Sequence, residues 1–260
     1  MRTTGSSMLK TVAPPVLFGV TILALWQVLT VAAGVPSFLL PAPTAIADAF
    51  SANVDAILKA ANATGANAFI GLLAGSVLGI AAAIVAVRFA VVDGLLGALA
   101  AGAAAVPIVA LAPLLNSMYS TTTDLPRRLV AAIVVFFPVF VSTAKGLRQV
   151  PRVQSDLMTA YAATGWQITR TVRLPAALPH LFTGLRIAAP GAVIAAIIAE
   201  YFGGLQHGLG SRITSAAANT AYPRAWAYVV AMVLGLVFLA AVLLLEQLTR
   251  RPRTTLWRSK

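Results

Sequence analysis

The feature that most constrains this chain is a series of apolar runs, each close to the length that a helix needs to cross a lipid bilayer. Such a crossing takes about 20 apolar helical residues. Segments near that length occur at residues 12–33, 68–87, 91–115, 129–143, 183–202 and 226–245. The chain is 59% hydrophobic and only 10% charged, which lies outside the range of soluble domains. We therefore predict a multi-pass, all-α integral membrane protein with six transmembrane helices in one domain, residues 1–260.

The first apolar run has an alternative interpretation as a signal peptide, because Arg2 and Lys10 precede it. Its apolar stretch is longer than the hydrophobic region of most signal peptides, and no cleavage site of small residues follows it. We expect a retained helix.

The basic residues predict the orientation in the membrane. The 19 Lys and Arg outnumber 7 acids and give a net charge of +12. A soluble nucleic-acid-binding protein could have this charge but would not carry such apolar runs, so no nucleic-acid partner is expected. Cytoplasmic loops of membrane proteins are enriched in Lys and Arg. Both termini and residues 145–182 are therefore predicted to be cytoplasmic, opposite a side that holds only Lys59, Arg127, Arg128, Arg212 and Arg224.

A polar segment that begins at Asp156 interrupts the apolar sequence. From Asp156 to about Arg170 no residue breaks a helix, and an acid at the start with a base at the end suits the helix dipole. Leu174-Pro175 is predicted to end this helix, and Leu178-Pro179 to begin the approach to the fifth span. A structured segment fixed outside the bilayer between two spans is expected to contact a partner.

Glycines and prolines mark places where the predicted spans can approach or bend. Gly71, Gly75 and Gly79 recur every four residues and so form one stripe, which favours close helix packing, although glycine is common in membrane helices in any case. Pro107 and Pro138 are predicted to break the third and fourth spans, because a proline frees a backbone carbonyl one turn back. These breaks could line a transport pathway or could be ordinary packed kinks.

The sequence contains no pattern typical of a catalytic or metal centre. It has no cysteine, and its only histidines, His180 and His207, are predicted to lie on opposite sides of the membrane as interfacial polar residues. No glycine-rich phosphate-binding loop followed by Lys-Ser/Thr occurs, so the chain is not expected to bind ATP by that mechanism. Any ATP hydrolysis must belong to a partner.

Two acids lie near the ends of spans. Glu200 is predicted toward the external end of the fifth span, where a carboxylate costs a few kcal/mol and is a functional candidate. It could gate a pathway, brace the following loop, contact substrate or be solvated at the interface. Glu246, near the cytoplasmic end of the last span, is expected to pair with Arg250 one turn later.

These residues resemble the permease subunits of ABC importers, in the branch that handles nitrate, sulfonates, taurine and pyrimidine-type vitamin precursors. The cytoplasmic signature of that family is Glu-Ala-Ala, three residues, Gly, nine residues, Ile, one residue and Leu-Pro. This chain keeps the spacing with Asp156, Ala162 and Val172 before Leu174-Pro175, while Leu157-Met158 replace the two alanines. Further similar segments are FLLPAPT, VALAPLL, FFPVFV, GLRQVP and LPAALPHLFTGLRIAAP.

The resemblance implies the MetI-like fold of type I, binding-protein-dependent importers in the bacterial inner membrane. It implies that residues 145–182 include a coupling helix that sits in a groove of a separate ATPase. The coupling residues implied by it are Asp156, Ala160, Ala162, Thr164, Gly165, Leu174 and Pro175. The implied partners are a second permease chain, identical or different, two subunits that bind ATP and Mg, and an extracytoplasmic substrate-binding protein. No cofactor is implied in this chain.

The resemblance does not determine the substrate or the role of one external loop. The segment NSMYSTTTD, from Asn116, replaces an aromatic and glycine-rich turn of relatives, and could mark a specialised surface or one half of a heterodimer. The run at Asp156, the LPAALPHLFTGLRIAAP segment and Glu200 look closest to permeases for hydroxymethylpyrimidine and riboflavin, with sulfonate, taurine and nitrate as the next candidates. The alternative is an ion-coupled secondary transporter, which would need midplane ionisable groups and internal repeats. A scaffold that transports nothing is disfavoured by the kinked spans.

Overall fold

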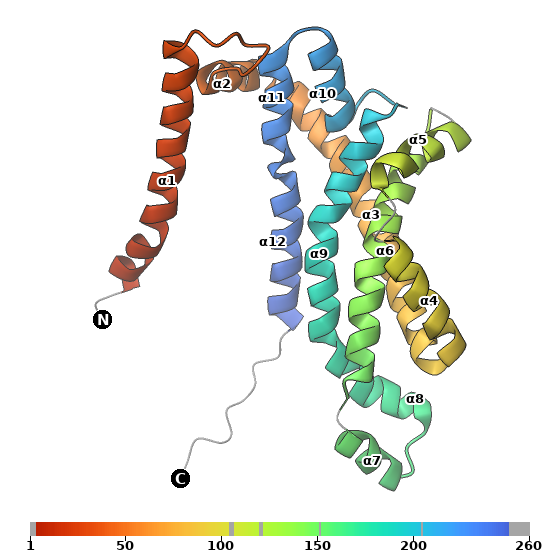
Figure 1. Ribbon diagram of the computed structural model, residues 1–260. Helices are drawn as coiled ribbons and strands as arrows, with labels where there is room; N and C mark the ends of the chain where they lie inside the picture. The colour runs from red at the N-terminus through yellow and green to blue at the C-terminus, as the bar shows by residue number, and fades with distance from the viewer. Residues whose placement is uncertain (1–3, 104–106, 120–121, 151, 204, 250–260) are drawn as a thin grey trace. The chain divides into compact units, whose positions relative to one another are not determined.

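The computed structural model describes residues 4–103, 107–119, 122–150, 152–203 and 205–249, and these form helices joined by short turns, with no strand among them (Figure 1). The predicted all-α class is confirmed. By its internal contacts the chain divides into two units, residues 1–60 with 212–231, and residues 61–211 with 232–260. Helices α3 (Val54–Arg88) and α10 (Leu209–Ala218) each contribute residues to both.

The first unit contains α1 (Thr4–Ala32), α2 (Pro43–Ala52) and α11 (Tyr222–Val230). The side chain of Gln27 joins α1 to the first turn of α2: its Oε1 accepts the N–H of Thr44 at 3.1 Å, and its Nε2 donates to the Thr44 hydroxyl at 3.2 Å. This satisfies a first-turn amide that has no partner within α2. Trp26 of α1 and Trp226 of α11 pack edge to face, with ring centroids 5.6 Å apart.

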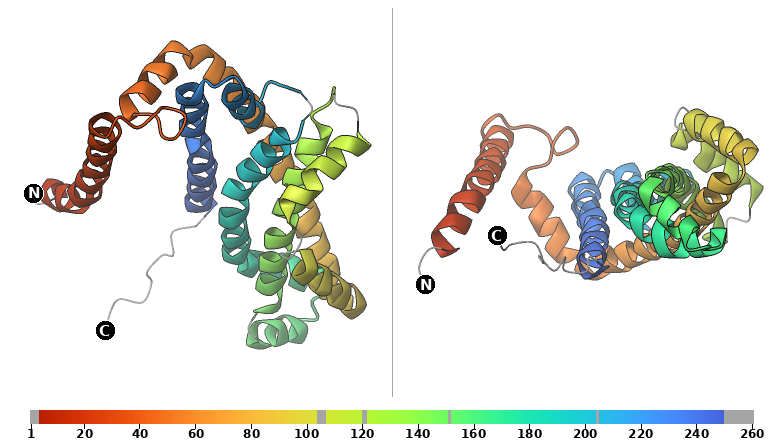
Figure 2. Two further views of the ribbon diagram at one scale, coloured as in Figure 1. Left: turned by 45° about the horizontal axis from the view of Figure 1, so that its top comes forward. Right: turned by 90° about the horizontal axis from the view of Figure 1, so that it is seen from below.

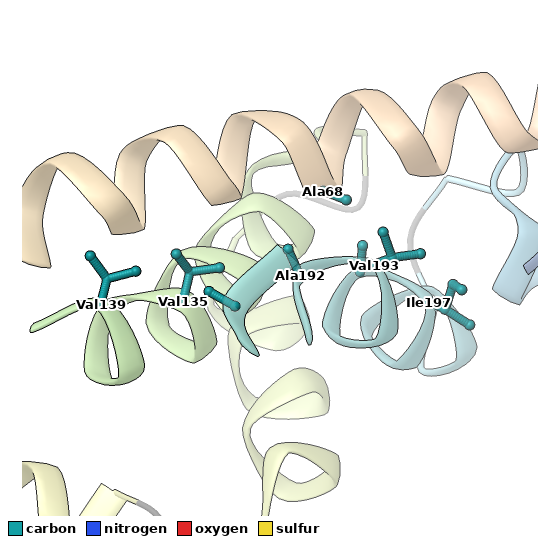
Figure 3. Packing of buried hydrophobic residues seen from close by; sticks show 8 residues of the cluster. Ala68, Val135, Val139, Ala192, Val193 and Ile197 are labelled. Carbon is teal, nitrogen blue, oxygen red and sulfur yellow. The ribbon is translucent and has the colours of Figure 1, made fainter. Parts of the chain in front are cut away.

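The second unit is built around α6 (Leu125–Arg148) and α9 (Leu174–Tyr201), which run side by side (Figure 1 and Figure 2). Helix α12 (Leu234–Thr249), which follows a short 3-10 turn at Ala231–Val233, packs on α9. Figure 3 shows small and β-branched side chains from three helices in its core: Ala68, Val135, Val139, Ala192, Val193 and Ile197. Such side chains let membrane helices approach closely.

The glycine stripe of α3 lies directly against the backbone of α6. A Cβ placed on Gly71 would overlap that of Ala131, and a Cβ on Gly75 would overlap the carbonyl oxygen of Ala132. On Gly79 it would lie 2.9 Å from the carbonyl oxygen of Phe136. The contact therefore has no room for side chains along this stripe.

Five described helical stretches are long and apolar enough to cross a membrane: Ala13–Ala32, Val54–Arg88, Leu125–Arg148, Gly165–Tyr201 and Tyr222–Thr249. The third predicted span, residues 91–115, falls instead on two shorter helices, α4 (Ala90–Ala103) and α5 (Ile108–Met118). Pro107 is the residue that caps the start of α5. A count of six therefore requires α4 and α5 to cross as one broken span, and it stays a prediction.

Helix α6 continues through Pro138, so the predicted break there is wrong. A proline inside a helix removes one backbone hydrogen bond. Val139 and Phe140 follow it and are fully buried in the core of the second unit. Packing of these side chains holds the helix together across the lost bond.

Candidate functional site

The polar segment predicted as one helix from Asp156 to about Arg170 is instead two helices joined by a tight turn. Helix α7 (Arg152–Ala160) ends before Ala162, whose φ of 53° lies in the left-handed region. The N–H of Ala162 donates to the carbonyl of Thr159 at 2.9 Å, and that of Ala163 donates to Met158 at 3.0 Å. Together these bonds close a Schellman motif. The continuous-helix prediction fails because this turn satisfies the carbonyls at the end of α7 without a further helical turn.

The second helix of the segment begins at a capping box. The Thr164 hydroxyl accepts the N–H of Gln167 at 3.4 Å, and the Gln167 side-chain oxygen accepts the N–H of Thr164 at 2.7 Å. These reciprocal bonds define the start of α8 (Gly165–Ile168) and satisfy two amides that a helix start leaves free. Thr164 and Gly165, both predicted coupling residues, therefore set where α8 begins.

Leu174-Pro175 was predicted to end the helix, but this prediction is wrong: the pair begins α9. A π-helical turn, η1 (Thr169–Arg173), leads from α8 into α9, and the N–H of Leu174 donates to the carbonyl of Thr169. Pro175, which has no N–H to donate, lies in the first turn of α9, where a proline is tolerated. As a result Gly165–Tyr201 is one continuous helical stretch. A displacement of α8 would be passed along this stretch.

Several large apolar side chains of the α7 and α8 region are exposed, as is Asp156. They are Val153, Leu157, Tyr161 and Trp166, with exposed fractions of 78%, 57%, 78% and 66%. Apolar side chains gathered on a surface segment between two spans are typical of an interaction site.

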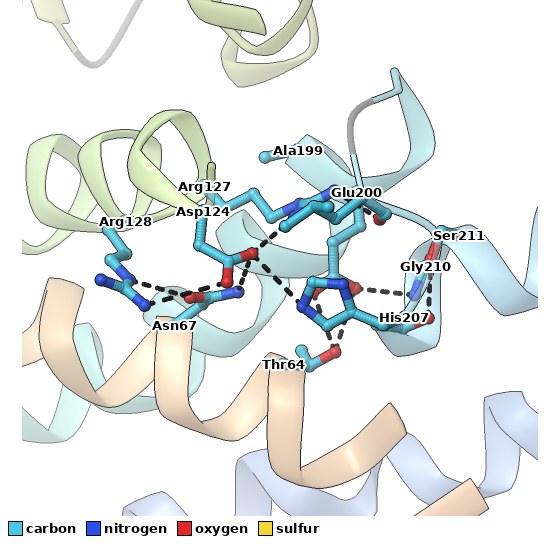
Figure 4. Close-up of polar contacts among 12 residues, drawn as sticks. Thr64, Asn67, Asp124, Arg127, Arg128, Ala199, Glu200, His207, Gly210 and Ser211 are labelled. Atoms are coloured by element: carbon cyan, nitrogen blue, oxygen red, sulfur yellow. Dashed lines mark hydrogen bonds and ion pairs between the residues drawn. The ribbon is translucent and has the colours of Figure 1, made fainter. Parts of the chain in front are cut away.

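At the far end of α9, Glu200 is buried and hydrogen-bonded to two other elements (Figure 4). The Thr64 hydroxyl of α3 lies 3.0 Å from each carboxylate oxygen, and the backbone N–H of Gly210, in α10, donates at 2.9 Å. Thr64 in turn accepts the N–H of Leu209 at 2.8 Å. Among the alternatives for Glu200, this geometry favours bracing of the following loop, while a role in gating stays a prediction.

The glycines of this loop make that contact possible. A Cβ on Gly208 would overlap the Glu200 carboxylate, and a Cβ on Gly210 would overlap the carbonyl oxygen of Ile197. The close approach of loop and helix therefore depends on the absence of both side chains.

Beside Glu200 lies a polar cluster that the sequence did not reveal (Figure 4). The Arg127 guanidinium is only 1% exposed and forms an ion pair with Asp124 at 2.6 Å. It also donates to the carbonyl oxygen of Leu205 at 2.5 Å and to that of Gly203 at 3.3 Å. Buried arginine is tolerated because its charge and several of its donors are paired.

Asp124 is the centre of this cluster. Asn67 donates to it at 3.1 Å, His207 lies 3.4 Å away, and Arg128 donates to Asn67 at 3.0 Å. Partial burial of Asp124 opposes its charged form, but the hydrogen bonds from Arg127 and Asn67 and the nearby charges outweigh burial and lower the pKa of its carboxyl group. An acid followed by two arginines at the start of an apolar run was the available signal, but its partner Asn67 is 57 positions away.

Glu246 pairs across helices. It is buried in α12 and forms an ion pair with Arg186 of α9. Its predicted partner, Arg250, lies outside the described residues. In the part of the chain that is described, no group of three or more His, Cys, Asp or Glu could hold a metal ion.

Most of this chain matches one known protein family. A family model described as "binding-protein-dependent transport system inner membrane component" matches residues 75–253, which include both the α7–α8 segment and Glu200. The chain belongs to this family of transport permeases. The resemblance to ABC importer permeases is thereby confirmed. The family is one of membrane permease subunits of ABC transporters, not of enzymes, and membership in it implies a substrate-binding protein and an ATPase as partners.

Three relatives of the permease align with 75% of its length. It is 28% identical over 196 residues to a probable ABC transporter permease protein of Haemophilus influenzae, covering 79% of that chain. It is 28% identical over 197 residues to the riboflavin transport system permease protein RibX of Chloroflexus aurantiacus, covering 73%. It is 30% identical over 197 residues to the formylaminopyrimidine transport permease protein ThiX of Halalkalibacterium halodurans, covering 78%.

Proposed function

We propose that this permease pairs with a second permease chain to form a pathway for a small polar or heterocyclic solute, and that two ATP-binding subunits drive it through α7 and α8. The observation that carries the proposal is the continuous helical stretch Gly165–Tyr201, which joins the exposed α7–α8 region to the buried Glu200. ATP and Mg belong to the partner subunits, and no cofactor is assigned to this chain.

The ATPase contact is assigned to the predicted coupling residues around the turn at Ala162. Asp156 and Ala160 lie on α7, with Thr164 and Gly165 at the start of α8. In the proposed orientation this region and both termini are cytoplasmic, because the basic residues gather there. ATP-driven closure of the ATPases would displace α7 and α8, and the rigid path through Leu174-Pro175 would carry this displacement into α9.

The gate is assigned to the opposite end of α9. There Glu200 holds α3 and α10 together through Thr64 and Gly210. A small displacement of α9 would favour one of two packings of these elements, with ATP supplying the bias. Pro107 and Pro138 are kept as pathway candidates. Residues 41–60 and residues 203–224 are each kept as candidate contacts of the external binding protein, and they consist largely of helix rather than loop.

The substrate is proposed from the relatives. The names of two of them specify transport of riboflavin and of formylaminopyrimidine, both nitrogen heterocycles. Together with the sequence pattern, this supports a hydroxymethylpyrimidine-like or riboflavin-like solute ahead of sulfonate, taurine or nitrate.

Reconstitution into liposomes with the partner ATPase and binding protein tests the proposal. We expect uptake of the solute to require ATP inside and binding protein outside, and to survive collapse of the proton gradient. Uptake that persists without ATP and stops when the proton gradient is collapsed would instead support an ion-coupled secondary transporter.

A further inference from the structure

A pocket of about 580 Å³ lies where the ends of α3 and α6 meet α8 and η1. The apolar side chains in its lining are Ile84, Val87 and Leu147. It is also lined by the aromatic Trp166 and by the cationic Arg88 and Arg173. The pocket borders the segment assigned to the ATPase, because Gly165 at the start of α8 also lines it and α8 lies beside the end of α6 (Figure 1). The proposed transport mechanism assigns no ligand to it.

Neither arginine of the pocket has an acidic partner in the described part of the chain, although the Arg88 guanidinium lies over the Phe89 ring, 5.7 Å from its centroid. No acid lines the pocket, and neither Arg88 nor Arg173 forms an ion pair with a carboxylate of the described residues. The neighbouring Arg148, by contrast, is paired with Asp93. Two arginines that line one pocket without an acid favour an anion, and the planar forks of guanidinium groups match the oxygens of a phosphate.

The position of the pocket selects the kind of phosphate. Arg88 is the last residue of a candidate membrane span, and Leu147 lies one residue before the end of another. Arginine and tryptophan at the ends of spans lie at the depth of lipid headgroups. Basic pockets between membrane helices bind anionic headgroups. The apolar part of the lining, Ile84, Val87 and Leu147, gives the adjoining acyl chains a place to pack.

We propose that this pocket binds an anionic phospholipid, with the phosphate on Arg88 and Arg173 and the acyl chains against the apolar side chains of α3 and α6. The bound lipid would contact α3 and, through Trp166 and Thr169, the segment assigned to the ATPase. A free phosphate has no apolar part that could pack against the apolar lining, whereas a phospholipid has acyl chains that could. The lining therefore favours a lipid.

Fluorescence quenching by brominated lipid tests the site in the purified, assembled importer. The signal to be measured is the quenching of Trp166 fluorescence, which is the component that is absent from the Trp166→Phe variant. Brominated phosphatidylglycerol is expected to quench this component at lower mole fraction than brominated phosphatidylcholine. In R88Q/R173Q, half-maximal quenching by phosphatidylglycerol should need about 25-fold more lipid, because each basic side chain beside an anionic headgroup contributes about a factor of five. Arg170→Gln, an exposed arginine of the same π-helical turn that does not line the pocket, is the matched control and should leave the curve unchanged.

Several outcomes would overturn the proposal. They are equal quenching by the two lipids, unchanged phosphatidylglycerol binding in R88Q/R173Q, and displacement of phosphatidylglycerol by glycerol 3-phosphate at equal concentration, which would assign the site to a free phosphate. The paired variant R88K/R173K keeps both charges and loses the planar forks, so its affinity should fall between those of the wild type and the glutamine variant. A lysine variant as weak as the glutamine variant would contradict recognition by charge. Because quenching measures binding alone, its result is independent of whether the importer transports the proposed solute.

Discussion

Glu200 of α9 accepts a hydrogen bond from the backbone N–H of Gly210 at 2.9 Å, and this bond holds the first turn of α10 against the end of α9. The Thr64 hydroxyl completes the site from α3. One buried carboxylate thus joins three elements. Removing this carboxylate would leave the Thr64 hydroxyl and the Gly210 N–H buried without an acceptor, which costs folding free energy.

Glu200→Ala is therefore expected to lower the free energy of unfolding by about 1–3 kcal/mol, because the N–H of Gly210 and the hydroxyl of Thr64 lose their acceptor. Glu200→Gln keeps one acceptor oxygen and should have a smaller effect. Thermal unfolding of the purified importer measures both. A Glu200→Ala variant as stable as the wild type would show that the carboxylate does not brace the loop.

Gly208→Ala tests the same contact from the loop side. The added Cβ would overlap the Glu200 carboxylate, and overpacking of this kind costs about 1–3 kcal/mol. Gly94→Ala, inside α4 where a Cβ meets no atom within 4 Å, is the matched control and should be neutral or slightly stabilising. Equal unfolding temperatures for the two variants would contradict the close approach.

Ala162→Gly should stabilise the turn between α7 and α8 by about 1 kcal/mol, because a left-handed backbone disfavours a residue with a Cβ. Hydrogen exchange of the α7 amides should slow in this variant. Ala163→Gly changes the next residue, which has no positive φ, and should not slow it. If both glycines act alike, the left-handed turn is not at Ala162.

The ion pair of Asp124 with Arg127 predicts an acid dependence of stability. The pKa of Asp124 is lowered in the folded protein from its ordinary value of 3.8, so its stabilisation is fully present above that value and is lost as the pH falls through the lowered pKa. The difference in unfolding temperature between wild type and Asp124→Asn should shrink as the pH falls below about 5. A difference that does not change with acid would contradict the ion pair.

The apolar runs predicted a membrane protein because the stability of a helix in lipid depends mainly on the residues of that helix. The same local reasoning failed at Ala162, where helix-forming residues surround a left-handed turn, and at Leu174-Pro175, where a π-helical turn lets the helix continue. The contacts of Glu200 with Thr64 and of Asp124 with Asn67 join residues more than 50 positions apart, and nothing in the sequence pairs them. The family signature located the α7–α8 segment by its spacing, even though Ala162 replaces its glycine.

In the proposed mechanism, the α7–α8 segment binds the ATPase and drives transport. The most direct test of this role is the association of the ATPase with Ala160→Glu, compared with Ala52→Glu at the exposed end of α2. Both variants should insert into the membrane normally. We predict that the ATPase copurifies with Ala52→Glu as with the wild type and is lost from Ala160→Glu, together with ATP-dependent uptake. Undiminished copurification and uptake with Ala160→Glu would contradict the assignment of α7 and α8 to the ATPase.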